Sequence, residues 1–244
     1  METMTQNIRE LVKSTKLKHI AIIMDGNRRW AKNRGLPSAM GHTKGVGALK
    51  ETLRACDEFG VKYLTVYAFS TENKKRPPEE VNFLMNLLGK TLESELDELS
   101  GNNARIKFLG RIDELAPKLR EIVKKSEEKT AKNEGVRFQI AFNYGSRTEI
   151  LDAVRKIAED VKDGKLDVSD ISEDVFGEYL YTRGMPDPDL VIRTSGEMRI
   201  SNYLLWQNAY SEIYVTERLW PEFGREPLAE AIENFASRQR RFGK

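Results

Sequence analysis

The chain has 244 residues, of which 39% are hydrophobic and 32% are charged, and its formal net charge is +2. A chain of that length can bury a large core. Because no low-complexity tract or Pro/Gly/Ser-rich linker divides it, we expect a single domain over residues 1–244. The near-neutral charge is not that of a dedicated nucleic-acid-binding protein, so we expect no nucleic-acid partner.

Three further features exclude other classes of protein. No run of about 18 apolar residues predicts a membrane span, and the polar N-terminal segment, residues 1–17, does not have the pattern of a signal peptide. The single cysteine, Cys56, excludes an intrachain disulfide and leaves too few ligands for a Cys/His zinc site. We therefore expect a cytoplasmic protein in which oxygen atoms would hold any metal ion.

Hydrophobic patterning alternates along the chain between short apolar runs typical of buried strands and longer stretches with helical spacing. In chain order, the pattern predicts a strand at 19–24, a helix at 44–59, a strand at 61–69, a helix at 77–101, a strand at 105–109, a helix at 114–132, a strand at 136–142, a helix at 147–161, strands at 190–192 and 213–216, and a helix at 225–241. This alternation predicts an α/β fold with a central, mostly parallel sheet of about six strands, flanked on both faces by helices and joined by right-handed crossovers.

Polar segments follow four of the predicted strands at their carboxyl ends. They are 25–30 (DGNRRW), 70–76 (STENKKR), 143–145 (NYG) and 193–199 (RTSGEMR). Ligands of open α/β sheets bind at this edge. A solvated loop is the ordinary explanation for any one segment, but four together predict a shared cleft.

The arginines of these segments indicate the ligand. Arg29, Arg76, Arg193 and Arg199 suit a multiply charged phosphate, because each guanidinium can donate two charge-assisted hydrogen bonds; a diphosphate is the simplest such ligand. Asp25 would repel an anion unless a cation lay between them, which indicates Mg²⁺ held by this carboxylate and by diphosphate oxygens. The alternative is that Asp25 caps a helix.

A glycine-rich segment, 41–45 (GHTKG), precedes the predicted helix at 44–59 and is a weaker candidate for phosphate binding, because glycine-rich turns are common. Its histidine, His42, could donate a hydrogen bond to an oxyanion. His19 and Cys56 are expected to be structural.

The helix predicted after the proline pair at 77–78 carries more apolar residues than one core stripe requires. A dimer face or a fully buried helix is the commoner explanation, and the alternative is the wall of an apolar tunnel leading from the anion cleft. Candidate tunnel-wall residues are Ala68, Leu84, Leu88, Val136 and Phe138.

Several long motifs carry a resemblance to a known family. They are HIAIIMDGNRRWAKNRG, GHTKG, YAFSTENKKRP, NYGSR, DLVIRTSGEMRISNYLLWQNAYSEIYVTERLWPEF and the terminal RRFG. In this order, and over nearly the whole chain, they resemble the cis-prenyltransferases. The chain also lacks the DDxxD motif of the unrelated trans-prenyltransferases.

The resemblance implies a homodimeric enzyme that uses Mg²⁺. It would add isopentenyl diphosphate repeatedly to an allylic diphosphate such as farnesyl diphosphate, forming double bonds of cis geometry. The expected product is a long-chain Z-polyprenyl diphosphate of the undecaprenyl kind, a lipid carrier precursor for cell-wall glycan synthesis, and the alternative is a short-chain product. A lipid product further implies transient membrane-surface contact for its release, and hence a cytoplasmic protein peripheral at the membrane.

The resemblance also implies which residues surround the substrates. Those around the allylic diphosphate or the reacting centre would be Gly26, Asn27, Arg28, Arg29, Trp30, His42, Ser70, Thr71, Glu72, Asn73 and Arg76. Those of the isopentenyl diphosphate site would be Arg193, Arg199, Ile200 and Ser201.

Catalytic roles follow from the same resemblance. Asp25 would be the essential acid and a metal ligand, and Asn73 is the residue often assigned as proton acceptor. An amide is a weak base, however, so Asp25, His42 and a phosphate oxygen remain candidates for that role.

Three residues would act across the dimer. Glu212 matches a second metal ligand, and Arg241 and Gly243 match a C-terminal motif that reaches the partner's active site. The chain departs from many bacterial relatives, which carry Arg, Trp and His at the positions of its Ser38, Lys74 and Met198; Lys74 could replace part of the missing charge.

Two other classes of protein could share some of these features. A non-catalytic partner subunit of the same fold is disfavoured because the acid and the arginines are all present. An RNA-binding protein would use the basic clusters at 28–29 and 238–241, and its binding would weaken steeply with salt.

Overall fold

The core of the fold is a six-stranded sheet in which every strand pairing is parallel. The computed structural model describes residues 2–240. The strands are β1 (His19–Ile23), β2 (Tyr63–Ser70), β3 (Arg105–Leu109), β4 (Arg137–Tyr144), β5 (Leu190–Arg193) and β6 (Glu212–Val215). Their order in the sheet is β3-β4-β2-β1-β5-β6, with β1 and β2 at the centre. The predicted α/β fold is confirmed, and each strand end lies within two residues of its predicted position.

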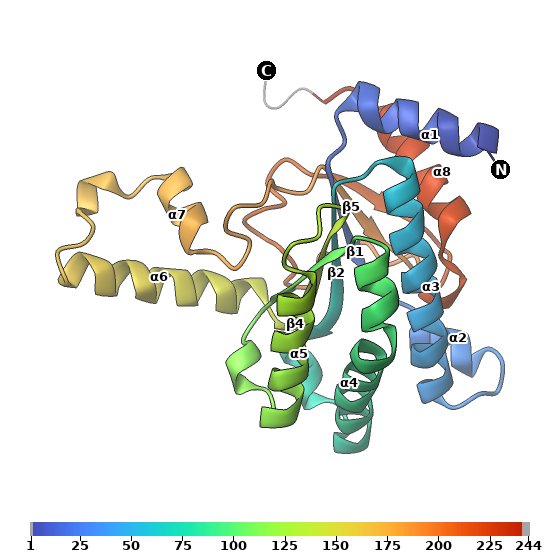
Figure 1. Ribbon diagram of the computed structural model, residues 1–244, viewed down its shortest axis with the longest axis horizontal. Coiled ribbons are helices and arrows are strands. Elements are labelled where there is room, and N and C mark those ends of the chain that lie inside the picture. Colours follow the sequence, from blue (N-terminus) through green and yellow to red (C-terminus); the bar gives the residue numbers. More distant parts are fainter. Residues whose placement is uncertain (1, 241–244) are drawn as a thin grey trace.

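Helices pack on one face of this sheet over the larger of two hydrophobic cores. They are α1 (Glu2–Thr15), α3 (Ser38–Phe59), α4 (Pro78–Gly101), α5 (Pro117–Thr130) and α8 (Arg225–Ala236) (Figure 1). All five residues of β1 are buried, as expected for a central strand covered on both faces. None of the helices described over residues 2–240 is both long and apolar enough to cross a bilayer.

The second face of the sheet carries a smaller core. Tyr203 and Leu204, from the irregular segment before β6, are fully buried there against side chains of the strands. Helix α6 (Ser146–Lys162) starts beside this core and extends away from the body together with α7 (Glu173–Tyr179) (Figure 1). The short helix α2 (Asn27–Lys32) is separated from the end of β1 by three residues, and the 3-10 helix η1 (Thr71–Lys75) follows β2 directly.

Four helices differ most from the sequence prediction. Helix α8 ends at Ala236, five residues before the predicted end at 241. The polar N-terminal segment forms α1, because Ile8 and Val12 lie one turn apart on a single face and are buried against the core. Helix α7 was not predicted; Ser172 caps it by accepting a hydrogen bond from the backbone N–H of Val175 at 3.2 Å. Helix α3 begins at Ser38, six residues before the predicted start at 44.

Candidate active site

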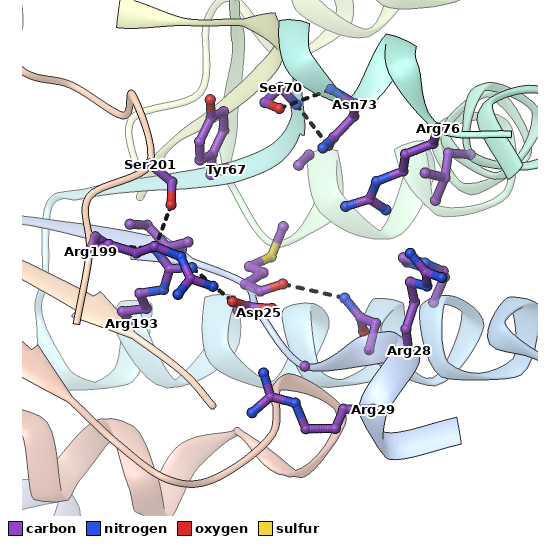
Figure 2. Close-up of a pocket in the computed structure, with 17 residues that line it drawn as sticks. Asp25, Arg28, Arg29, Tyr67, Ser70, Asn73, Arg76, Arg193, Arg199 and Ser201 are labelled. Carbon is purple, nitrogen blue, oxygen red and sulfur yellow. Dashed lines mark hydrogen bonds and ion pairs between the residues drawn. The ribbon is translucent and has the colours of Figure 1, made fainter. Parts of the chain in front are cut away.

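A cleft of about 510 Å³ lies at the carboxyl edge of the sheet, where β1, β2 and β5 end (Figure 2). The predicted site residues that line it are Asp25, Gly26, Asn27, Arg28, Arg29, His42, Ser70, Asn73, Arg76, Arg193, Arg199 and Ser201. Three of the four predicted loops therefore converge. The fourth, 143–145, does not line the cleft: Asn143 is buried and its Nδ2 donates to the backbone oxygen of Arg111 at 2.8 Å.

Some predicted residues lie outside this cleft. Trp30 stacks beneath the guanidinium of Arg34, 4.5 Å from the ring centroid. Glu72 accepts a hydrogen bond from Asn202 at 2.7 Å, Thr71 bonds Glu72, and Ile200 packs against the smaller core. None of these is among the residues that line the cleft.

The residues predicted to act across a dimer are not in the cleft of their own chain. Glu212 begins β6 opposite Leu190, at the amino edge of the sheet, and its carboxylate accepts a hydrogen bond from Arg238 at 2.8 Å. Arg241 and Gly243 lie outside the described residues.

The centre of the cleft is an ion pair between Asp25 and Arg193. The Arg193 side chain is 5% exposed; its Nη2 donates to Asp25 Oδ2 at 2.8 Å and its Nη1 donates to Ser201 Oγ at 2.7 Å. The Asp25 side chain is 31% exposed. Asp25 is not a helix cap, because α2 has Gly26 at its N-cap with a φ of 106°, a conformation that favours glycine.

On one side of this pair, two arginines share a carboxylate. Arg29 Nη2 lies 2.9 Å from Glu197 Oε1, and Arg199 Nη1 lies 2.6 Å from Glu197 Oε2. Hydrogen bonds from Arg199 and Arg29 lower the pKa of Glu197, which therefore stays ionised at neutral pH.

On the other side, three basic groups surround Glu80. Arg76 donates to it at 2.9 Å, while His42 and Arg28 approach it at 3.7 and 3.9 Å. Burial, followed by the charge of Arg76, lowers the pKa of His42, so its imidazole is neutral near pH 7. The cleft thus holds two groups of arginines around Asp25, one paired with Glu197 and the other with Glu80 (Figure 2).

Ser70 and Asn73 are fixed by a reciprocal pair of hydrogen bonds at the start of η1. The backbone N–H of Asn73 donates to Ser70 Oγ at 3.2 Å, and the backbone N–H of Ser70 donates to Asn73 Oδ1 at 3.1 Å. The backbone N–H of Ser70 can only donate, so the Asn73 atom facing it must be the amide oxygen. The NH₂ group of Asn73 then points away from Ser70 and can donate to another acceptor. This arrangement favours Asn73 as a hydrogen-bond donor rather than a base.

Tyr67 lines the cleft from within β2 and was not predicted as a site residue. Its ring stacks on Tyr203 at 4.5 Å, and its hydroxyl donates to the backbone oxygen of Tyr144 at 3.3 Å. Burial raises the pKa of Tyr67, so the phenol stays protonated. A tyrosine inside an apolar strand has the pattern of a core residue, and only the sheet order places it at the cleft.

The segment 41–45 does not form a phosphate-binding loop at a helix start, because it lies inside α3. Its glycines instead let Asn27 approach: a Cβ at Gly41 would lie 2.0 Å from the carbonyl oxygen of Asn27, and one at Gly45 would lie 2.4 Å from its side-chain Oδ1. This close packing holds the segment 25–30 against α3.

An apolar cavity of about 140 Å³ adjoins the cleft between the sheet, α3 and α4. The two share Met24, Asn27, His42, Ala68 and Leu84 as lining residues. Of the predicted tunnel-wall residues, those that line this cavity are Ala68, Leu84, Leu88 and Phe138. Val136 lines a separate cleft of about 250 Å³.

Asp25 is the carboxylate best placed to hold a metal ion. Over residues 2–240, no cluster of three or more His, Cys, Asp or Glu side chains forms a ready-made metal site. Mg²⁺ commonly takes one or two protein carboxylates and completes its shell with substrate phosphates and water. A single carboxylate flanked by arginines that could hold phosphate oxygens fits a Mg²⁺ that binds together with a diphosphate.

Comparisons with known proteins agree with this geometry. The family model described as putative undecaprenyl diphosphate synthase matches residues 23–243. An isoprenyl transferase of Clostridium perfringens is 51% identical, with 96% of this chain and 92% of that protein covered. The ditrans,polycis-undecaprenyl-diphosphate synthase ((2E,6E)-farnesyl-diphosphate specific) of Micrococcus luteus is 49% identical, with 93% and 91% covered.

A solved structure is similar over the same length. Lavandulyl diphosphate synthase from Lavandula x intermedia, in complex with dimethylallyl diphosphate, superposes with a TM-score of 0.91 at 38% identity, covering 93% of this chain and 98% of that chain. The fold, the family model and the relatives therefore agree that this chain is a prenyl transferase of the family described as putative undecaprenyl diphosphate synthase.

Proposed function

We propose that the protein condenses isopentenyl diphosphate repeatedly with an allylic diphosphate such as farnesyl diphosphate, giving a long-chain Z-polyprenyl diphosphate of the undecaprenyl kind. The observation that carries this proposal is one cleft with two groups of cations around Asp25, which adjoins an apolar cavity. Two charged head groups and a growing hydrocarbon tail need these surroundings.

The two groups of cations divide the diphosphates between them. The allylic diphosphate would lie against the loop that follows β1, near Arg28, His42 and Arg76. Isopentenyl diphosphate would lie near Arg193 and Arg199 together with Ser201 Oγ. Charge-assisted hydrogen bonds of this kind contribute roughly 1.5–3 kcal/mol each.

The reaction begins as the allylic diphosphate departs and carbocation character develops at its first carbon. Mg²⁺ held by Asp25 would neutralise charge that develops on the leaving group. The arginines stabilise the same charge through fixed donors. The double bond of isopentenyl diphosphate then attacks, and a proton leaves its second carbon.

We infer that Asn73 is not the acceptor of that proton, because an amide is a weak base and its oxygen already accepts one hydrogen bond, from the backbone N–H of Ser70. Asp25, neutral His42 and a diphosphate oxygen are the remaining candidates. We assign Asn73 the role of donating its NH₂ to a substrate oxygen from the edge of the cleft.

We further propose a homodimer. Exposed large apolar side chains occur on β6, on the segment before it and on α6; they are Leu151, Val154, Leu205, Trp206, Tyr210 and Ile213. The cross-dimer role that the family resemblance implies for Glu212 would require such a second copy. Release of a long-chain product would then require transient contact with a membrane surface.

The full chain should be incubated with farnesyl diphosphate, labelled isopentenyl diphosphate and Mg²⁺, and the extracted products sized. We expect labelled long-chain products, and a loss of at least about 10²-fold in incorporation for Asp25→Asn, the scale seen when one group that stabilises developing charge is removed. Asp113→Asn, which changes an exposed carboxylate outside the cleft, is the matched control and should leave incorporation unchanged.

Two results would overturn the proposal: no incorporation by the unsubstituted chain, or equal incorporation by the two variants. Binding of RNA that weakens steeply with salt, without prenyl transfer, would favour the RNA-binding alternative. The structure weakens that alternative, because Arg238 and Arg240 are engaged by Glu212 and Asp189.

A further inference from the structure

Helix α4 is a loosely held wall of the apolar cavity. It has 24 residues, but only Gly89 and Leu92 are buried. Its apolar side chains are mostly half-buried, and several of them, including Leu84 and Leu88, line the cavity. Elements with few buried contacts open at low free-energy cost, so α4 is the wall that can move.

The volume of the cavity requires that a wall moves. At about 140 Å³, it is close to the roughly 150 Å³ of an engineered cavity that accommodates a single benzene molecule. One isoprene unit has five carbons, nearly as many as benzene, so the cavity holds little more than one unit. If the proposed function is right, a long product needs more room than this cavity offers, and α4 is the wall with the fewest buried residues to give way.

Four charged residues join these two helices at the end of the cavity away from Asp25. Lys50 Nζ on α3 lies 2.6 Å from Glu95 Oε2 and 3.1 Å from Glu98 Oε2 on α4. Arg54, one turn further along α3, also pairs with Glu98. We call Lys50, Arg54, Glu95 and Glu98 the latch.

The latch lies between the apolar cavity and a second cleft. Lys50 and Glu95 line the apolar cavity, and Lys50, Arg54 and Glu98 line the second cleft of about 250 Å³. Leu53 and Leu99 line both. A hydrocarbon tail that outgrows the cavity along this axis therefore meets the latch before it reaches the second cleft.

We propose that the latch sets the length of the product by resisting the separation of α3 and α4 at this point. Each isoprene unit that enters the cavity removes its carbons from water, which lowers the free energy of the complex. The unit that reaches the latch must also break half-exposed ion pairs, and beyond them it enters a cleft with charged walls. Growth stops when the free energy gained by burying one more isoprene unit is smaller than the free energy needed to separate α3 from α4. A weaker latch therefore permits longer products. This inference rests on the proposed function.

Two variants break the latch from opposite sides. Lys50→Met removes the cation, and the double variant Glu95→Gln/Glu98→Gln removes the anions. Because they leave opposite charges behind, a common shift in product length assigns the effect to the ion pairs rather than to either side chain. Lys50→Arg keeps the charge and should keep the product.

The matched control is Asp97→Asn. Asp97 lies on the same helix but pairs with Lys129 on α5, away from the cavity. Products are sized by mass spectrometry at a fixed ratio of farnesyl to isopentenyl diphosphate, and the rate of the first condensation is measured in parallel. We expect both latch variants to lengthen the main product by one or more isoprene units with an unchanged first condensation, and the control to make the unsubstituted product.

Latch variants that are active but make products of unchanged or shorter length would overturn the latch alone. Absence of any prenyl product from the unsubstituted chain would overturn the proposed function, and the latch with it.

Discussion

Substitution of Gly41 by alanine tests how the cleft is positioned. Gly41 lies in α3 where the backbone of Asn27 crosses it, and an added Cβ would sit 2.0 Å from the Asn27 carbonyl oxygen and 2.8 Å from its carbonyl carbon. Real Cβ contacts stay above about 3.0 Å, so one of the two backbones must move by about 1 Å. Asn27 lies two residues after Asp25, and both line the cleft.

A displacement of about 1 Å in a reacting group can cost about 10²-fold in rate, so Gly41→Ala should lower kcat by that factor. Overpacking should also destabilise the protein by about 1–3 kcal/mol. The assay is steady-state incorporation of labelled isopentenyl diphosphate, with stability measured by urea unfolding.

Gly47→Ala on the same helix is the control. It is exposed and a Cβ there meets nothing within 4 Å, so the change should keep full turnover and add about 0.5–1 kcal/mol of stability. Equal turnover by Gly41→Ala and Gly47→Ala would show that the close approach of Asn27 to α3 does not position the site.

Three further substitutions test other parts of the structure. Phe138→Ala should lengthen the products by enlarging the cavity and cost about 3–5 kcal/mol of stability, since the ring is 2% exposed; an unchanged chain distribution would count against it. Burial lowers the pKa of His19 to about 4, so between pH 4 and 6.5 only the unfolded chain binds a proton at this residue. Stability should therefore fall by about 3 kcal/mol as the pH drops through that window. The free energy of unfolding in urea should depend less on pH for His19→Gln, and parallel profiles for the two proteins would contradict this. Lys74→Met breaks a half-exposed ion pair with Glu114 at 2.8 Å and should lower stability by about 0.2–1 kcal/mol. Because Lys74 does not line the cleft, kcat should stay unchanged, and a clear loss of kcat would mean that Lys74 contacts substrate.

The fold could be predicted from the sequence because each strand is a short apolar run bounded by polar residues. Strand β3 was predicted with its observed bounds, Arg105–Leu109. Helix α1 was missed because its average composition is polar, although Ile8 and Val12 lie at helical spacing. Helix α7 buries none of its residues completely, so no apolar stripe marks it.

The loops of the site could also be predicted, because the loops that leave parallel strands gather at the carboxyl edge of the sheet. The pairing of the site's arginines with carboxylates from other elements could not be predicted. Glu80 lies in the first turn of α4, where an acid has a local explanation in the helix dipole. Its pair with Arg76 is local in sequence, four residues apart, but only the packing of α4 places it beside Arg28. The glycines at 41–45 were a weak candidate for a phosphate-binding loop and lie inside α3. A glycine needed for helix packing and one needed for a loop look alike in sequence.

These carboxylates explain how a nearly neutral protein can present so many arginines to a ligand. Arg193 is held by Asp25, Arg29 and Arg199 by Glu197, and Arg76 by Glu80, so the donors are positioned before any ligand arrives. A ligand must compete with carboxylates already in place. A monoanion would only exchange one such partner for another, whereas a diphosphate brings more charge and more acceptor oxygens than the groups it displaces. The paired arginines therefore favour diphosphates over simpler anions, and the apolar cavity beside them favours those that carry a hydrocarbon tail.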